Sequence, residues 1–140
     1  MILFLDDEKW YLQSYLEELE MRKLKVVFTS EVKEAHKLLG ENAGQIELMI
    51  LDVMMPLEDE SETQPDSGLS TGIRVYEKVR QKYQTLPIII FTNDSDGMVE
   101  ERFSKEDNCW FMKKDDYLPF ELADEVEKIL SSIAPGGQNG

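Results

Sequence analysis

Five short apolar runs are spaced along the chain, and each is continuous rather than interrupted by polar residues. The runs are Ile2–Leu5, Val26–Phe28, Leu48–Leu51, Ile88–Phe91 and Trp110–Met112. Strands that are buried on both faces, as in a parallel sheet, have this pattern. We therefore predict five buried strands.

Amphipathic patterns separate these runs. Apolar residues recur there at spacings of three and four, which places them on one face of a helix. The stripes are Leu12, Tyr15, Leu16 and Leu19; Val32, Ala35, Leu38 and Leu39; Tyr76, Val79 and Tyr83; and Leu122, Val126, Ile129, Leu130 and Ile133. A weaker stripe of Val99 and Phe103 predicts a further helix over Met98–Lys105. Alternating strands and helices predict an α/β fold, with helices on both faces of a parallel sheet and right-handed crossovers.

The connection after the third run is unusually long. It is acidic and rich in Ser, Thr, Gly and Pro, whereas loops from strand to helix usually have about 2–6 residues. We expect a mobile loop over Glu58–Ser70 that is dispensable for folding. The length of the chain indicates one domain over residues 1–134, and residues 135–140 read as a flexible tail or the start of a linker.

The charge balance narrows the classes of partner. The chain has 29 acidic and 15 basic residues and a net charge of −14. Such a surface repels phosphate backbones, so we expect no direct binding of nucleic acid, and it suits a cation or a partner with a basic patch. The apolar runs are too short to cross a membrane. The single cysteine, Cys109, excludes an internal disulfide and suits a reducing compartment. We expect a cytoplasmic protein.

Polar residues suited to phosphate and metal chemistry follow four of the five predicted strands. They are Asp6, Asp7 and Glu8; Asp52; Thr92 and Asn93; and Lys113 and Lys114. Any one of them alone would be better explained as a helix cap or a solvated side chain. Ligands of open α/β sheets bind beyond the carboxyl ends of the strands, where all of these residues would meet. Close carboxylates repel one another without a cation, and oxygen ligands without His or thiolate favour Mg²⁺.

With these residues in place, the chain resembles a receiver domain of bacterial two-component signalling, similar to the chemotaxis receiver. The segments that carry the resemblance are LDDE, LDVMMP, IIIFTN and WFMK, each at the end of a predicted strand. Together with the alternating strands and helices they cover nearly the whole chain. The resemblance implies a doubly wound, flavodoxin-like sheet of five parallel strands in the order 2-1-3-4-5.

The resemblance also implies a metal site. Asp52 would accept the phosphoryl group and bind Mg²⁺. Asp7 would bind the ion directly, and Asp6 directly or through water. Met54 would contribute its backbone carbonyl.

Three further roles follow from the same resemblance. Thr92 would hydrogen-bond a phosphoryl oxygen, and a lysine after the fifth strand would pair with the phosphoryl charge. The family usually has proline after that lysine, whereas Lys113 is followed by Lys114 here. We assign the role to Lys113, because it directly follows the apolar run. Trp110, three residues earlier, matches the aromatic switch position, and we weigh a switching role equally against that of a fixed core residue.

The implied function is that of a phosphoacceptor signalling receiver. It would take a phosphoryl group from a phosphohistidine of a sensor histidine kinase or phosphotransfer protein and switch its surface for a downstream effector. The donor histidine would lie on the partner, because His36, the only histidine, is on a predicted helix away from the strand ends. Such a domain forms and loses its own aspartyl phosphate and is not a turnover enzyme.

Two alternatives remain open. A pseudo-receiver would have the same fold and act as a phosphorylation-independent interaction module; the intact Asp7, Asp52, Thr92 and Lys113 argue against it. A Mg²⁺-dependent phosphotransferase or phosphatase with an aspartyl nucleophile usually has a second carboxylate two residues later as general acid. That position is Met54 here, which cannot donate a proton.

Overall fold

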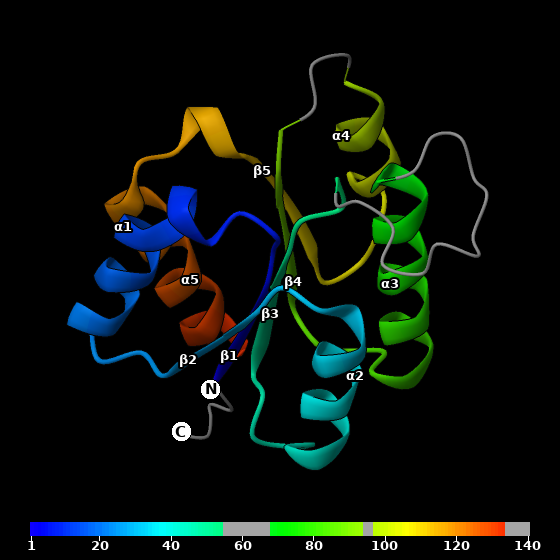
Figure 1. Ribbon diagram of the computed structural model, residues 1–140, viewed down its shortest axis with the longest axis horizontal. Helices are drawn as coiled ribbons and strands as arrows, with labels where there is room; N and C mark the ends of the chain where they lie inside the picture. Colours follow the sequence, from blue (N-terminus) through cyan, green and yellow to red (C-terminus); the bar gives the residue numbers. More distant parts are fainter. Residues whose placement is uncertain (55–67, 94–96, 134–140) are drawn as a thin grey trace.

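Five strands and five α-helices alternate along residues 1–54, 68–93 and 97–133, which are the residues that the computed structural model describes (Figure 1). In chain order the elements are β1 (Ile2–Leu5), α1 (Lys9–Met21), β2 (Val26–Thr29), α2 (Val32–Glu41), β3 (Leu48–Leu51), α3 (Gly68–Lys82), β4 (Ile88–Thr92), α4 (Met98–Phe103), β5 (Cys109–Lys113), the short 3-10 helix η1 (Lys114–Asp116) and α5 (Pro119–Ile133). The predicted alternation of strands and helices is confirmed.

The strands form one parallel sheet in the order β2-β1-β3-β4-β5. The doubly wound, flavodoxin-like fold is therefore confirmed. Every residue of β1, β3 and β4 is buried, whereas most residues of the edge strands β2 and β5 are only partly buried. This difference explains why the three inner strands have continuous apolar sequences: both of their faces are covered by helices.

Helices α1 and α5 pack on one face of the sheet, and α2, α3 and α4 pack on the other (Figure 1). Phe4 and Phe91 belong to the core under α1 and α5, whereas Leu5 and Ile90 belong to the core under α2, α3 and α4. Successive side chains of a strand point to opposite faces. This alternation determines which side chains can meet beyond the strand ends.

Two predicted boundaries differ from the structure. The loop predicted over Glu58–Ser70 ends too late, because residues 68–70 already form the first turn of α3. The helix predicted over Met98–Lys105 ends at Phe103, and its Val99 and Phe103 are buried as the stripe indicated. The remainder of the loop, up to residue 67, and the expected tail at residues 135–140 lie outside the described residues. None of the described helices is long and apolar enough to cross a membrane.

Gly72 lets α3 lie directly against the backbone that follows β3. A Cβ atom at this position would come within 2.1 Å of the carbonyl oxygen of Val53 and 2.2 Å of its Cα. Any side chain at position 72 would therefore push this backbone away. Val53 is the neighbour of Asp52, so the contact helps to fix the end of β3 where the candidate site lies.

Candidate functional site

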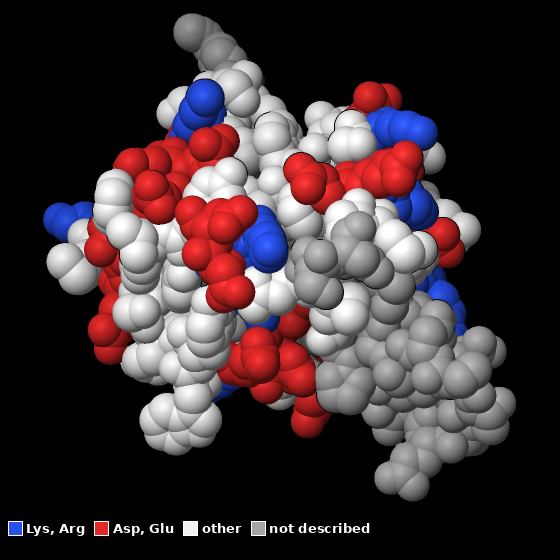
Figure 2. Space-filling model, turned by 90° about the horizontal axis from the view of Figure 1, so that it is seen from above, with Lys and Arg blue, Asp and Glu red and all other residues white. Residues whose placement is uncertain are grey.

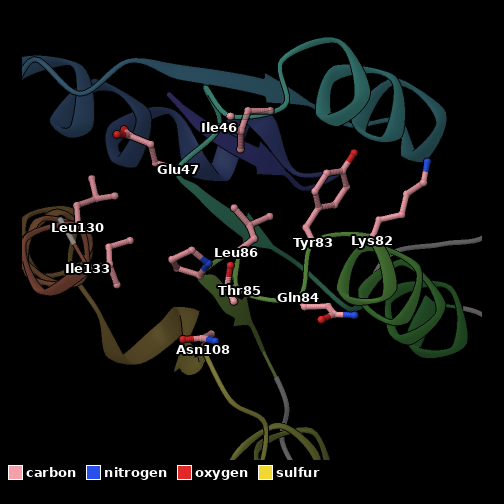
Figure 3. Close-up of a pocket in the computed structure, with 12 residues that line it drawn as sticks. Ile46, Glu47, Lys82, Tyr83, Gln84, Thr85, Leu86, Asn108, Leu130 and Ile133 are labelled. Carbon is pink, nitrogen blue, oxygen red and sulfur yellow. The ribbon is translucent and has the colours of Figure 1, made fainter. Parts of the chain in front are cut away.

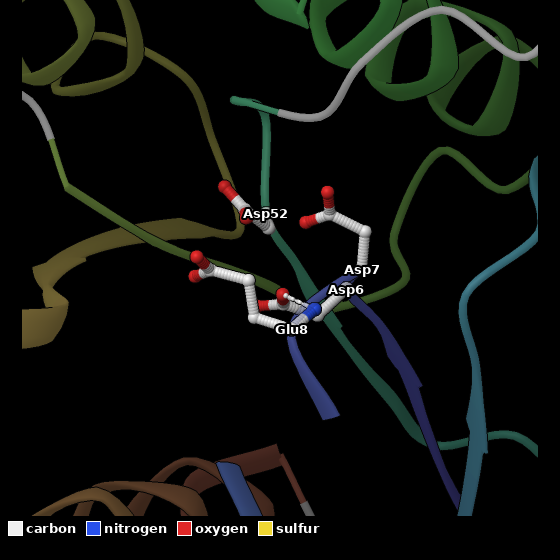
Figure 4. Close-up of side chains that lie close together, drawn as sticks. All are labelled: Asp6, Asp7, Glu8 and Asp52. Atoms are coloured by element: carbon white, nitrogen blue, oxygen red, sulfur yellow. Dashed lines mark hydrogen bonds between the residues drawn. The ribbon is translucent and has the colours of Figure 1, made fainter. Parts of the chain in front are cut away.

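Four carboxylates meet at the carboxyl ends of β1 and β3. Asp6, Asp7 and Glu8 follow β1, and Asp52 follows β3. These strands are neighbours with Leu5 opposite Leu51, so the residues that follow them lie side by side. One carboxylate oxygen from each of the four residues lies within 4.8 Å of the others (Figure 4).

Asp52 is held in a single orientation by its surroundings. Its Oδ1 accepts a hydrogen bond from the Thr92 hydroxyl at 2.5 Å and another from the Met54 N–H at 2.9 Å. Its Oδ2 faces the ammonium group of Lys114 at 3.2 Å. The side chain is 3% exposed. A buried carboxylate with both oxygens engaged is a fixed group rather than a solvated surface charge.

Lys114 supplies the positive charge at the centre of the cluster. Its side chain is 2% exposed, and its Nζ lies 2.8 Å from Glu8 Oε1, 2.9 Å from Asp6 Oδ2 and 3.2 Å from Asp52 Oδ2. Burial lowers the pKa of Lys114, but the charges of Asp52 and Asp6 outweigh it and hold the pKa above its usual value. Lys114 therefore stays charged at neutral pH and offsets part of the carboxylate repulsion.

The assignment of Lys113 to this place needs correction, because Lys114 lies there instead. Lys113 is the last residue of β5 and pairs with Thr92. It makes no ion pair with the four carboxylates among the described residues. The apolar run stops at Met112, but β5 continues for one more residue. Since side chains alternate along a strand, Lys114 rather than Lys113 points to the same side as Met112. This alternation could have identified Lys114 from the sequence, but the choice of Lys113 rested on its position directly after the apolar run.

Trp110 and its neighbour Phe111 pack on opposite faces of the sheet. Trp110 packs into the core under α1 and α5, whereas Phe111 packs into the core under α2, α3 and α4. Ile90 shares that second core, so Thr92, two residues further along β4, belongs to the same face. The residue three positions before Lys114 is Phe111. Thr92 therefore shares its face of the sheet with Phe111, and Trp110 lies on the opposite face.

The acidic cluster fits a cation. Burial and the charge of Asp52 raise the pKa of Asp6 to about 7 and also raise the pKa of Asp7. Asp6 Oδ2 is buried and accepts no well-formed hydrogen bond from the described residues, although the charge of Lys114 lies near it. Four carboxylates offer oxygen atoms alone, which is the donor set that Mg²⁺ prefers. The role of the Met54 carbonyl stays a prediction; the Met54 N–H binds Asp52.

Acidic side chains gather in several groups on the face that lies above the strand ends, and basic atoms are seen among them (Figure 2). This distribution agrees with the net charge of −14. A large cavity of about 800 Å³ lies at the opposite end of the sheet, bordered by segments that precede β3, β4 and β5 and by the end of α5 (Figure 3). Its lining has Glu47 and Lys82 as its charged residues and brings together no group of carboxylates comparable to the candidate site.

Comparisons with known proteins agree with this fold. The profile of the response regulator receiver domain matches residues 2–116. No curated protein is similar enough in sequence to count as a match. Among solved structures, the receiver domain of the hybrid histidine kinase CckA is 27% identical, with a TM-score of 0.67, and the match covers 92% of this chain and 97% of that one.

Two further solved structures are similar in fold. A response regulator receiver domain protein from Clostridium thermocellum is 19% identical, with a TM-score of 0.70 and 94% of each chain covered. The receiver domain of an HD domain-containing protein from Pseudomonas fluorescens Pf-5 is also 19% identical, with a TM-score of 0.71; the match covers 94% of this chain and 86% of that one.

Proposed function

The chain belongs to the family of response regulator receiver domains, and we propose that it is a phosphoacceptor that takes a phosphoryl group onto Asp52 in a Mg²⁺-dependent reaction. Receiver domains are signalling domains rather than turnover enzymes, and they interact with histidine kinases and downstream effectors.

The observation that carries the proposal is the environment of Asp52. Its carboxylate is buried, and three groups hold it: the Thr92 hydroxyl, the Met54 N–H and the Lys114 ammonium. A carboxylate reacts poorly with an anionic phosphoryl group unless positioning and positive charge help it. Lys114 supplies charge within 3.2 Å of Oδ2, and the two hydrogen bonds to Oδ1 limit rotation of the carboxylate.

Receiver domains generally bind Mg²⁺ at an acidic pocket, and in this chain Asp6, Asp7, Asp52 and the Met54 carbonyl would hold the ion. When bound, Mg²⁺ supplies positive charge beside the incoming phosphoryl oxygens. Asp6 Oδ2 is buried, and Lys114 offsets its charge without a well-formed hydrogen bond. This placement and the raised pKa values of Asp6 and Asp7 support the assignment, because a cation would reduce the repulsion among the carboxylates. Lys114 would pair with one phosphoryl oxygen, and the Thr92 hydroxyl would donate to another.

The proposed transfer moves the phosphoryl group from a histidine nitrogen of the donor to a carboxylate oxygen of Asp52. A carboxylate oxygen of Asp52 forms a bond to phosphorus, and the bond from phosphorus to the histidine nitrogen of the donor breaks. The donor nitrogen keeps the electron pair and takes up a proton. Water later attacks phosphorus, which releases inorganic phosphate and restores the carboxylate, so that the signal limits itself.

The phosphohistidine would belong to a sensor histidine kinase or phosphotransfer protein in the cytoplasm. Residues 1–134 would form the receiver, followed by a tail or linker from residue 135. On phosphorylation, Thr92 would move towards the phosphoryl group, and Phe111 would occupy the space that Thr92 leaves on the same face of the sheet. The surface of α4, β5 and α5 would then change for a downstream effector.

Acetyl phosphate with Mg²⁺ provides a direct test. The wild-type protein should gain the mass of one phosphoryl group, as measured by intact mass spectrometry, and Asp52→Asn should gain none. Asp116→Asn, which removes an exposed carboxylate from η1, is the matched control and should be labelled like the wild type. A folded wild-type protein that takes up no phosphoryl group, with this donor or with beryllofluoride as its mimic, would favour the pseudo-receiver.

A further inference from the structure

Glu8 is the third carboxylate on Lys114, and it differs from the other two in exposure. Its Oε1 accepts a hydrogen bond from Lys114 Nζ at 2.8 Å, the shortest of the three contacts. The Glu8 side chain is 56% exposed, whereas those of Asp6 and Asp52 are 0% and 3% exposed. Glu8 alone can therefore turn away into water without a change in the backbone.

The local backbone directs Glu8 towards this contact. Its N–H donates a hydrogen bond to Asp6 Oδ1 at 2.9 Å, which fixes the Glu8 backbone beside the buried Asp6 carboxylate. Glu8 is also the N-cap residue of α1, yet its side chain makes no capping hydrogen bond to that helix. Residues that cap helices well are shorter, such as Ser, Asp or Asn. The Glu8 carboxylate therefore binds the lysine rather than the start of the helix.

A phosphoryl group on Asp52 needs the same ammonium group. An ammonium group has three N–H donors, and three carboxylates surround that of Lys114 in this structure. A phosphoryl oxygen can reach Lys114 only when one carboxylate leaves it. Asp6 and Asp52 are buried, so Glu8 is the carboxylate that can withdraw into water most readily.

We propose that Glu8 is a positioning residue that holds Lys114 in the resting state and competes with the phosphoryl group for it. This inference rests on the proposed phosphorylation of Asp52 and adds a residue that sets how readily the phosphorylated state forms. The lysine keeps a partner in the resting state, and each phosphorylation event must break the contact between Glu8 and Lys114. Neutralising Glu8 should thus favour the phosphorylated state.

Beryllofluoride binding in the presence of Mg²⁺ measures this competition at equilibrium. Glu8→Gln keeps the size of the side chain and removes its charge, and the dissociation constant for beryllofluoride should fall by about twofold to fivefold, the range expected for a partly exposed ion pair. Glu8→Asp keeps the charge but is one methylene shorter, so it should lose the contact with Lys114 and bind beryllofluoride about as tightly as Glu8→Gln.

Two controls separate lysine capture from other roles of Glu8. If Glu8 acts only by repelling anions, Glu8→Asp will bind beryllofluoride like the wild type, and the inference is wrong. Asp115 is a nearby carboxylate that accepts a hydrogen bond from the Tyr11 hydroxyl and makes no contact of this kind with Lys114. Asp115→Asn should therefore leave the affinity for beryllofluoride almost unchanged. Mg²⁺ affinity is measured separately by titration, and a tenfold loss in Glu8→Gln would make Glu8 a metal ligand and overturn the inference.

The outcomes also distinguish this inference from the proposed function. Equal beryllofluoride affinity in the wild type, Glu8→Gln and Glu8→Asp would reject the role of Glu8 and leave phosphorylation of Asp52 intact. Absence of binding in all three folded proteins would reject the proposed function and the role of Glu8 together. Binding by Glu8→Gln and Glu8→Asp but not by the wild type would support both, with Glu8 as a strong inhibitor of the phosphorylated state.

Discussion

The Thr92 hydroxyl donates a hydrogen bond to Asp52 Oδ1 at 2.5 Å, so these two residues are already joined without a phosphoryl group. Both are buried, and each comes from the carboxyl end of a different inner strand. A phosphoryl group on Asp52 would have to replace this bond with one from Thr92 to a phosphoryl oxygen. Any movement of Thr92 towards that oxygen leaves space on its own face of the sheet, where Phe111 lies and Trp110 does not.

We therefore predict that Phe111 reports the state of Asp52. In a Phe111→Trp variant in which Trp10 and Trp110 are replaced by Phe, beryllofluoride with Mg²⁺ should change the fluorescence emission. Adding Thr92→Ala should remove that change, because the hydroxyl that links the two positions is absent. The matched control retains Trp110 as the single tryptophan and should respond weakly. An equal response with and without Thr92→Ala would show that the two positions are not coupled.

The identity of the functional lysine gives a second prediction. Lys114→Met should lose most beryllofluoride binding and, without Mg²⁺, should lower the free energy of unfolding by about 3 kcal/mol, because it leaves buried carboxylates without their counter-charge. Lys113→Met removes an equal charge outside the cluster and should change stability by no more than about 0.5 kcal/mol. Urea unfolding measures both values. The reverse order of effects would restore the assignment made from the apolar run.

The third prediction concerns Mg²⁺ and stability. The proposed Mg²⁺ site exists only in the folded protein, so a Mg²⁺ concentration of 100 times the dissociation constant should stabilise the protein by about 2.7 kcal/mol. Asp7→Ala should remove most of this response, which is read from the thermal unfolding midpoint with and without Mg²⁺. It should also stabilise the metal-free protein slightly, since the charges of Asp7 and Asp52 repel each other. Asp116→Asn serves as the control and should respond like the wild type.

The inner strands could be predicted from the sequence because burial on both faces leaves a continuous apolar run, as in Leu48–Leu51, whereas the sheet order came from the family resemblance. The convergence of Asp6 and Asp52 also followed, since the carboxyl ends of parallel neighbours share one edge. The functional lysine could not be chosen by its distance from the apolar run. β5 continues one residue past that run, to Lys113, and a shift of one residue reverses the side to which a side chain points. Glu8 received no role, because a run of acidic residues does not reveal which of them reaches a lysine 106 positions away.

The last prediction links the packing of α3 to the chemistry of Asp52. Gly72→Ala would place a Cβ atom 2.1 Å from the Val53 carbonyl oxygen, and backbone atoms cannot move aside as a flexible side chain can. We expect a loss of about 1–3 kcal/mol in the free energy of unfolding. Displacement of Val53 should also move Asp52 away from Thr92, so the variant should bind beryllofluoride more weakly even where it is fully folded.

Gly40→Ala is the matched control for this variant. Gly40 lies in α2 and has no atom within 4 Å of an added Cβ, so alanine should stabilise the protein by about 0.5–1 kcal/mol through helix propensity. Its beryllofluoride affinity should equal that of the wild type. If Gly72→Ala unfolds at the same urea concentration as the wild type and binds beryllofluoride equally well, the contact between α3 and Val53 does not position the acceptor, and the orientation of Asp52 depends on Thr92, Met54 and Lys114 alone.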